Sequence, residues 1–281
     1  MTTHQRQPEM PDLRVLPVAD LLLHEQHDPL RSAPLLQRLQ ADGVLKNPTI
    51  VAPVPGEQRY VVLDGAHRVT AMRELGIAHI AVQVVDYEDP ELILDTWHHL
   101  VKGVSVAHFK QMLRAAQGVK VEAADGVHAR ARLARREILA FVEYPDGEVR
   151  TVQASGDLHE RTRRLNEIVD LYKVQGRIFR ANTDHLPSLL PIYDDVAALV
   201  VFPRFAPAEI IDLARVGACL PAGITRHLIP RRALRINLPL TVLGSDASLP
   251  EKNAWLVDWM KQKVASKAAR FYAESTFLFD E

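Results

Sequence analysis

The segment Tyr60–Gly76, with the sequence YVVLDGAHRVTAMRELG, decides how the first part of this chain folds. It opens with a short apolar run that includes two valines, which is typical of a buried strand. The chain must then turn at Asp64-Gly65. The apolar residues that follow recur at helical spacing as far as Gly76, which stands where a helix C-cap belongs. The segment therefore predicts a strand, a sharp turn and a helix over 64–76.

Polar residues gather where the predicted strand passes into the predicted helix. Asp64, His67 and Arg68 all fall on this turn. The first turn of a helix offers backbone N–H groups to an anion, and a guanidinium group is a forked donor suited to phosphate. Asp64 cannot bind phosphate, but it can hold a metal ion or orient a donor. We predict a phosphate-binding turn; the alternative is a helix cap at Asp64 followed by solvated residues.

Composition restricts the class of protein. The chain has 281 residues, enough for two domains or one large one, and 47% of them are hydrophobic, as in an ordinary globular protein. Its 34 Lys and Arg residues are balanced by 35 Asp and Glu residues, which argues against a protein whose main task is to grip nucleic acid. The single cysteine, Cys219, fits a reducing cytoplasm. Neither a signal segment nor a membrane span is recognisable, so we expect a cytoplasmic protein.

Short strands and helices alternate over the first hundred residues. After a flexible tail at 1–12, the pattern predicts strands at 13–17, 48–54, 60–63 and 80–86, and helices at 31–41, 64–76 and 90–102. Such alternation is typical of a compact α/β domain, here over 13–102. The remainder, 103–281, is less regular. Its predicted helices are 104–117, 125–136, 160–174, 209–216 and 255–271, and its predicted strands are 138–144, 148–153, 198–202 and 235–240.

A second polar cluster precedes the first predicted helix. His24 and Glu25 open a loop that also contains Asp28 and Arg31. A carboxylate on such a loop can act as a general base when a hydroxyl group comes within hydrogen-bonding reach. The alternative is a solvated loop residue without a chemical role.

Two more clusters lie further along the chain. The segment 96–99 reads TWHH, and adjacent histidines on a helix point about 100° apart, which argues against a shared metal ion. The segment 221–227 reads PAGITRH and is followed by Arg231 and Arg232. A hydroxyl group beside several cationic donors can hold a carboxylate or a phosphate. The alternative is an exposed basic turn.

In these four clusters, taken in their order along the chain, the sequence resembles the free serine kinases, including siderophore-cluster members that also act as regulators. The resemblance runs from Leu16 to about Leu243 and rests on LHEQHDPLR, DGAHRVTAMRELG, TWHH and PAGITRHLIPRRALRINLPL. It implies an α/β (α+β) fold with a ParB/sulfiredoxin-like N-terminal domain over 13–102. A mixed α/β C-terminal, substrate-binding domain over 103–281 would follow, with the active-site cleft between the two.

The resemblance implies phosphoryl transfer from ATP or ADP to free L-serine, giving O-phospho-L-serine, with Mg²⁺ bridging the phosphates. By this resemblance, Glu25 is the general base on the serine hydroxyl, and Asp64 is a second catalytic residue that can also hold Mg²⁺. The nucleotide-phosphate residues implied are Gly65, Ala66, His67, Arg68 and Thr70; many members have histidine where this chain has Ala66. The substrate residues implied are Trp97, Thr225, Arg226, His227 and Arg231.

Other functions stay open. One is a ParB-like, nucleotide-dependent DNA-binding regulator without kinase activity, because the arginine-rich segment 129–136 allows nucleic-acid contact. Against it, the phosphate motif lacks the doubled arginines of ParB proteins. Another is a regulator that kept the fold and lost catalysis. A sulfiredoxin activity is excluded, because that chemistry needs a thiolate where this chain has Ala66.

Overall fold

The computed structural model describes residues 10–26 and 29–272, with side chains for all of these except 29–32. Residues 1–9 of the predicted tail, Asp28 and the side chain of Arg31 lie outside the described part. The described chain forms two compact units. Unit 1 takes residues 10–21, 29–89 and 229–272, and unit 2 takes residues 22–26 and 90–228. The chain thus leaves unit 1 and returns to it, whereas the sequence prediction had one boundary after residue 102.

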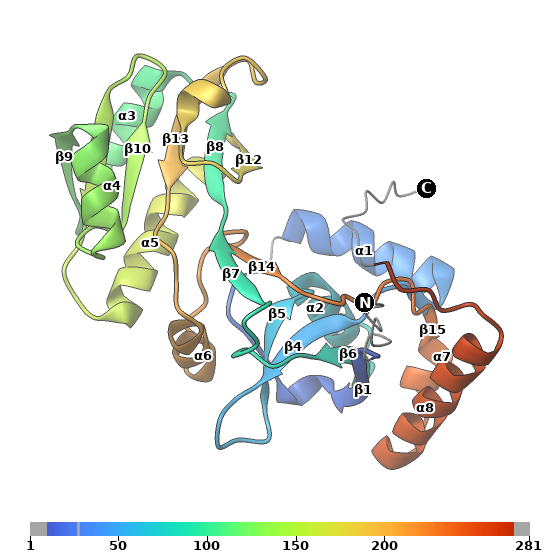
Figure 1. The fold of residues 1–281 in the computed structure, drawn as a ribbon. Coiled ribbons are helices and arrows are strands. Elements are labelled where there is room, and N and C mark those ends of the chain that lie inside the picture. The colour runs from blue at the N-terminus through green and yellow to red at the C-terminus, as the bar shows by residue number, and fades with distance from the viewer. Residues whose placement is uncertain (1–9, 27–28, 273–281) are drawn as a thin grey trace, which may run out of the picture. The chain divides into compact units, whose positions relative to one another are not determined.

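Unit 1 is built on a five-stranded mixed sheet in the order β1-β6-β4-β5-β2 (Figure 1). The strands are β1 (Asp12–Pro17), β2 (Leu21–Leu23), β4 (Thr49–Pro53), β5 (Tyr60–Asp64) and β6 (His79–Val84). β4 runs parallel to β6 and forms a hairpin with β5. Ile50, Val51 and Ala52 are consecutive and all completely buried, so β4 is covered on both faces.

Helices of unit 1 come from both ends of the chain. α1 (Pro29–Asp42) packs against α2 (Ala66–Glu74), and α8 (Leu249–Ala265) packs against β1. The Asn253 side chain of α8 accepts from the Val15 N–H and donates to the Val15 carbonyl, each at 2.9 Å. The short elements η1 (Val18–Asp20), β3 (Val44–Leu45), β15 (Leu238–Pro239) and α7 (Leu240–Leu243) complete the unit. The end of the chain therefore returns to the sheet that its beginning forms.

Unit 2 is built on a six-stranded antiparallel sheet in the order β12-β8-β13-β10-β11-β9 (Figure 1). The strands are β8 (His98–Lys102), β9 (Lys120–Ala124), β10 (Ala140–Glu143), β11 (Val149–Gln153), β12 (Arg177–Ala181) and β13 (Val196–Val201). Its helices are α3 (Val106–Ala115), α4 (Gly126–Ala134), α5 (Leu158–Lys173), η2 (Leu186–Ser188) and α6 (Pro207–Arg215). A separate ribbon pairs β7 (Ile93–Thr96) with β14 (Thr225–Leu228).

The helix predicted over 90–102 is wrong. That stretch forms β7 and β8, and Leu100 and Val101 are completely buried in the six-stranded sheet. The spacing of its apolar residues is compatible both with the 3.6-residue period of a helix and with the two-residue period of a strand. The neighbouring strands β12 and β13 supply backbone partners on both sides, and this tertiary pairing selects the extended form.

The mixed α/β class is confirmed, as are most of the other predicted elements, with shifted ends. The strand predicted over 235–240 is reduced to the two residues of β15. The helix predicted over 255–271 begins earlier, because Ser248 and Glu251 form a capping box ahead of α8. In the part of the chain that the structure describes, no helix combines the length and apolarity of a membrane span.

Candidate functional site

The predicted strand, turn and helix over 60–76 are confirmed. β5 ends at Asp64, Gly65 is the N-cap with φ 103°, and α2 begins at Ala66. Glycine reaches this left-handed conformation without the strain that a Cβ brings. No side chain caps α2, so the alternative in which Asp64 serves as a helix cap is wrong. His67 and Thr70 are half-buried on the same helix.

Two arginines bind the carboxylate of Asp64. Arg68 Nη2 donates to Asp64 Oδ2 at 2.8 Å, and Arg232 Nη2 donates to the same oxygen. Burial acts to raise the pKa of Asp64, but the charges of Arg68 and Arg232 outweigh it and hold that pKa below its ordinary value. Asp64 is therefore an anion at neutral pH, and Oδ1 is the oxygen that neither arginine binds.

Arg68 carries an unused donor at this turn. Its side chain is 19% exposed, and its Nε is buried with no partner among the described residues. A Cβ added to Gly65 would lie 2.7 Å from Arg68 Nη2 and 2.9 Å from Nε. The guanidinium group thus lies against Gly65 at the start of α2. A buried donor without an acceptor is costly, and an anion placed here would satisfy it.

Glu25 in unit 2 is held by Gly223, in the loop before β14, and by Thr225, the first residue of β14. Its Oε1 accepts hydrogen bonds from Thr225 N at 2.6 Å and from Thr225 Oγ1 at 2.5 Å. Its Oε2 accepts one hydrogen bond, from Gly223 N at 2.9 Å. Glu25 also forms a parallel bridge with Leu220. Because a carboxylate oxygen can accept two hydrogen bonds, Oε2 retains capacity for one more donor.

His24 extends this hydrogen-bond chain. Its Nε2 lies 2.8 Å from Thr225 Oγ1, and its side chain is buried. Since the single hydroxyl proton of Thr225 is donated to Glu25, the His24 Nε2–H must be the donor to Thr225. The ring of His227 meets that of His24 edge to face, with centroids 5.4 Å apart. Buried side chains therefore fix the carboxylate of Glu25.

The β7–β14 ribbon and the residue after it position Trp97 and Arg226. Trp97 follows β7, and its N–H donates to the carbonyl of Ile224 at 2.7 Å. The Arg226 guanidinium lies over the Trp97 ring, 4.4 Å from the centroid, and Arg226 Nη1 is 3.8 Å from Asp95 Oδ2. Trp97 is half-buried where the chain passes from β7 to β8, and the face of its ring packs against the Arg226 guanidinium.

The predicted 221–232 cluster divides between the two units. Thr225, Arg226 and His227 belong to unit 2, and Arg231 and Arg232 belong to unit 1 because the chain crosses after β14. Arg231 Nη2 donates to Asp89 Oδ2 at 2.9 Å. Arg232 binds the carboxylate of Asp64 and does not belong to the same unit as Thr225, Arg226 and His227. The sequence singled out Arg232 only as a neighbour of Arg231 in a basic segment and did not predict this pairing.

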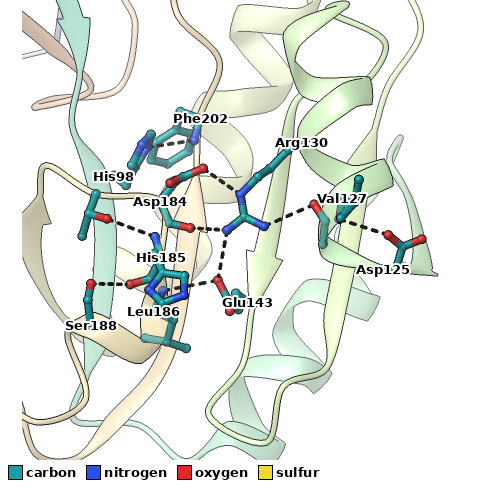
Figure 2. Close-up of polar contacts among 12 residues, drawn as sticks. His98, Asp125, Val127, Arg130, Glu143, Asp184, His185, Leu186, Ser188 and Phe202 are labelled. Carbon is teal, nitrogen blue, oxygen red and sulfur yellow. Dashed lines mark hydrogen bonds and ion pairs between the residues drawn. The ribbon is translucent and has the colours of Figure 1, made fainter.

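Of the two histidines of the TWHH segment, His99 is buried and His98 is half-buried in unit 2. Burial lowers the pKa of His98 to about 4 and that of His99 to about 3; the charge of Arg180 acts in the same direction on His99. His98 Nδ1 accepts from the Phe202 N–H at 3.3 Å, near the ion pair of Arg130 with Asp184 (Figure 2). Within the described residues, no three His, Cys, Asp or Glu side chains are grouped to hold a metal ion.

Arg180 is a candidate that sequence reasoning missed. It lies on the edge strand β12 opposite His99, and its side chain is exposed. A Cβ added to Gly223 would lie 2.5 Å from Arg180 Nη2 and 2.8 Å from Cζ. Arg180 therefore lies against the same loop that binds Glu25. Nothing in its sequence surroundings signals this, because the approach depends on strand pairing.

Known proteins resemble the chain over nearly its whole length, although no family model matches it. The ATP-dependent L-serine kinase of Staphylothermus marinus is 26% identical over 231 residues, which cover 82% of this chain and 90% of that protein. The ATP-dependent L-serine kinase SbnI of Staphylococcus aureus is 27% identical over 273 residues, or 96% and 97%. The ADP-dependent L-serine kinase SerK of Thermococcus kodakarensis is 25% identical over 226 residues, or 78% and 88%.

Solved structures share the fold. A free serine kinase in complex with AMP matches with a TM-score of 0.71 and 18% identity, over 86% of this chain and 98% of that one. C-terminally truncated SbnI from Staphylococcus aureus matches with a TM-score of 0.69 and 23% identity, over 92% and 97%. The resemblance to serine kinases that the ordered clusters predicted is confirmed by these names.

Proposed function

We propose that this chain is a small-molecule kinase that transfers the terminal phosphoryl group of ATP or ADP to the hydroxyl group of free L-serine. The products are O-phospho-L-serine and the nucleotide with one phosphate fewer. The observation that carries the proposal is Glu25, a carboxylate fixed by Gly223 and Thr225 with Oε2 able to accept one more hydrogen bond. The likeness to L-serine kinases over nearly the full chain supports the same activity.

Unit 1 supplies the phosphate-binding half of the reaction. The backbone at Gly65 and Ala66, the start of α2 and the buried Nε of Arg68 are suited to a terminal phosphate. We assign His67 and Thr70 to the same motif. Phosphoryl transfer depends mainly on positioning and charge neutralisation, so the absence of an imidazole at Ala66 removes a contact without removing the site.

Unit 2 supplies the acceptor half. Glu25 Oε2 accepts the hydrogen bond of the serine hydroxyl and takes its proton as the hydroxyl oxygen bonds to phosphorus and the bond to the leaving phosphate breaks. Thr225 and His24 hold the carboxylate in place. We assign Trp97, Arg226 and His227 to the walls of the serine site; Arg231 stays a predicted substrate residue.

Mg²⁺ fits the residues present in unit 1. Mg²⁺ in kinases is held by substrate phosphates and one or two carboxylates, and it neutralises the charge of the transferred group. Asp64 is ionised, and its Oδ1 is bound by neither Arg68 nor Arg232. We propose Asp64 Oδ1 as the protein ligand.

The alternative, a DNA-binding regulator, gains no support from the arginine-rich helix α4 and the turn after it. Arg130 pairs with Asp184 at 2.8 Å, Arg135 pairs with Glu137 at 2.5 Å, and Arg136 pairs with Glu209. Each of these arginines is thus neutralised by a carboxylate, so the three arginines do not form an uncompensated basic surface. A mobility shift that weakens steeply between about 50 and 200 mM salt would favour DNA binding instead.

The test of the proposed function is an assay for phosphoserine. Purified protein is incubated with L-serine, Mg²⁺ and either ATP or ADP, and the product is measured by mass spectrometry. We expect Glu25→Gln to lower kcat by about 10²- to 10⁴-fold, the usual contribution of a positioned base. Nucleotide affinity, measured by calorimetry, should stay unchanged. Glu167→Gln on α5 removes an equal charge as a control. No phosphoserine from the unaltered protein with either nucleotide would refute the proposal.

A further inference from the structure

Free L-serine presents more than a hydroxyl group. Its α-carboxylate is an anion that must leave water when the amino acid binds, and such a group needs a charge-assisted partner. A planar guanidinium can bind both carboxylate oxygens, which makes arginine the preferred residue for this task. The serine hydroxyl and the carboxylate carbon are joined through two carbon atoms, so they lie about 3 to 4 Å apart. The partner must therefore lie close to Glu25.

Arg180 meets this requirement within unit 2. Gly223 N donates to Glu25 Oε2, the oxygen that would receive the serine hydroxyl. A Cβ on the same glycine would lie 2.5 Å from Arg180 Nη2, so the guanidinium is packed directly against this residue. Gly223 also has φ 79°, a conformation that favours glycine. The missing side chain at Gly223 thus provides the space that the guanidinium occupies.

The other arginine of the site is engaged differently. Arg226 lies flat over the Trp97 ring and close to the carboxylate of Asp95. The carboxylate of Asp95 would repel the α-carboxylate of serine. The surroundings of Arg226 are therefore better suited to the ammonium group of serine than to its carboxylate. Arg180 is exposed on an edge strand and lies on the Gly223 side of Glu25.

We propose that Arg180 binds the α-carboxylate of L-serine and makes the site specific for free amino acids. Arg180 is then a specificity residue that deepens the proposed function and rests on it. Its planar fork holds the carboxylate beside Gly223, while the neighbouring Glu25 Oε2 accepts from the hydroxyl.

The experiment compares L-serine with L-serinamide, which keeps the hydroxyl and the ammonium but has no carboxylate. We expect Arg180→Gln to raise KM for L-serine about 10²-fold, the usual effect of losing a charge-assisted pair, with KM for nucleotide unchanged. KM for L-serinamide should change little, so the preference for L-serine collapses. Arg180→Lys should restore part of the preference, because it keeps the charge but not the fork.

Arg177→Gln is the matched control. Arg177 lies on the same strand, is also exposed, and points to the opposite face of the strand from Arg180. Melting temperatures of all variants show whether folding is intact. Arg180 does not bind the carboxylate if Arg180→Gln keeps the preference for L-serine over L-serinamide, or if this variant raises KM for both substrates by the same factor. A lack of phosphoserine with the unaltered protein would instead overturn the proposed function.

Discussion

Glu25 illustrates how single residues acquire a function through their partners. Its sequence surroundings, a polar loop, are equally compatible with a solvated glutamate. In the structure, backbone N–H groups of Gly223 and Thr225 and the Thr225 hydroxyl fix both carboxylate oxygens. These donors hold the carboxylate in one orientation, which a general base requires.

The Thr225 hydroxyl can be tested by itself. Thr225→Val keeps the shape of the side chain but removes the donor to Glu25 Oε1 and the acceptor of His24 Nε2. We expect kcat to fall by about 10-fold, because the loss of one hydrogen bond to a charged group costs about 1.5 kcal/mol or more. Thr225→Ser retains the hydroxyl and should stay within a few-fold of the unaltered protein. The test is the initial rate of phosphoserine formation. Equal kcat values for the valine and serine variants would contradict the proposed role of the Thr225 hydroxyl in holding Glu25.

At the scale of elements, the turn between β5 and α2 does two things at once. It reverses the chain through Gly65, and it brings Arg68 against that glycine and beside Asp64. Among the described residues, no acceptor faces the buried Nε of Arg68, and a buried donor without an acceptor is costly. We expect a phosphate at the start of α2 to accept from this donor and so to stabilise the turn.

Gly65→Ala tests this element. The new methyl group would fall 2.7 Å from Arg68 Nη2 and would also strain the backbone at φ 103°. We expect nucleotide affinity to fall by at least about 10-fold and stability by roughly 1–3 kcal/mol. Gly56→Ala is the control, since Gly56 also has a positive φ of 77° but its Cβ would meet nothing within 4 Å. Calorimetric titration with nucleotide distinguishes the two; equal affinities for both variants would refute a phosphate role for this turn.

At the scale of the whole molecule, the proposed function draws its residues from both units. The phosphate turn and Arg232 belong to unit 1, and Glu25, Thr225 and Arg180 belong to unit 2. Each group combines residues that are distant in sequence: Glu25 and Thr225 are 200 residues apart, and Asp64 and Arg232 are 168 apart. Each of these groups therefore forms only when its own unit is folded.

Acid should destabilise the molecule through His98, which is half-buried, and His99, which is buried. The pKa values of His98 and His99 are lowered from 6.5 to about 4 and about 3, so the folded state keeps both rings neutral while the unfolded state takes up protons below pH 6.5. The contribution of these two neutral rings to stability is thus fully present above pH 6.5 and is lost as the pH decreases. We expect a loss of about 2 kcal/mol per histidine between pH 6.5 and about pH 5.

His98→Asn tests the acid effect, because its amide oxygen can still accept from the Phe202 N–H while the side chain no longer titrates. Urea unfolding at several pH values should show a flatter pH dependence for this variant. His159→Asn, at an exposed position on α5, should leave the dependence unchanged. An unaltered slope in the His98 variant would contradict the assignment.

The mixed α/β class, the strand and helix around Asp64-Gly65, and the resemblance of the ordered clusters to serine kinases could all be predicted from the amino-acid sequence. These features could be predicted because a turn, a helical period or a motif is encoded by residues that are close together in the sequence. Three other features became apparent only in the three-dimensional structure: residues 90–102 contain two strands, Arg232 binds Asp64, and Arg180 lies against Gly223. Those outcomes depend on pairing between strands and on contacts across long stretches of chain, which no local pattern encodes.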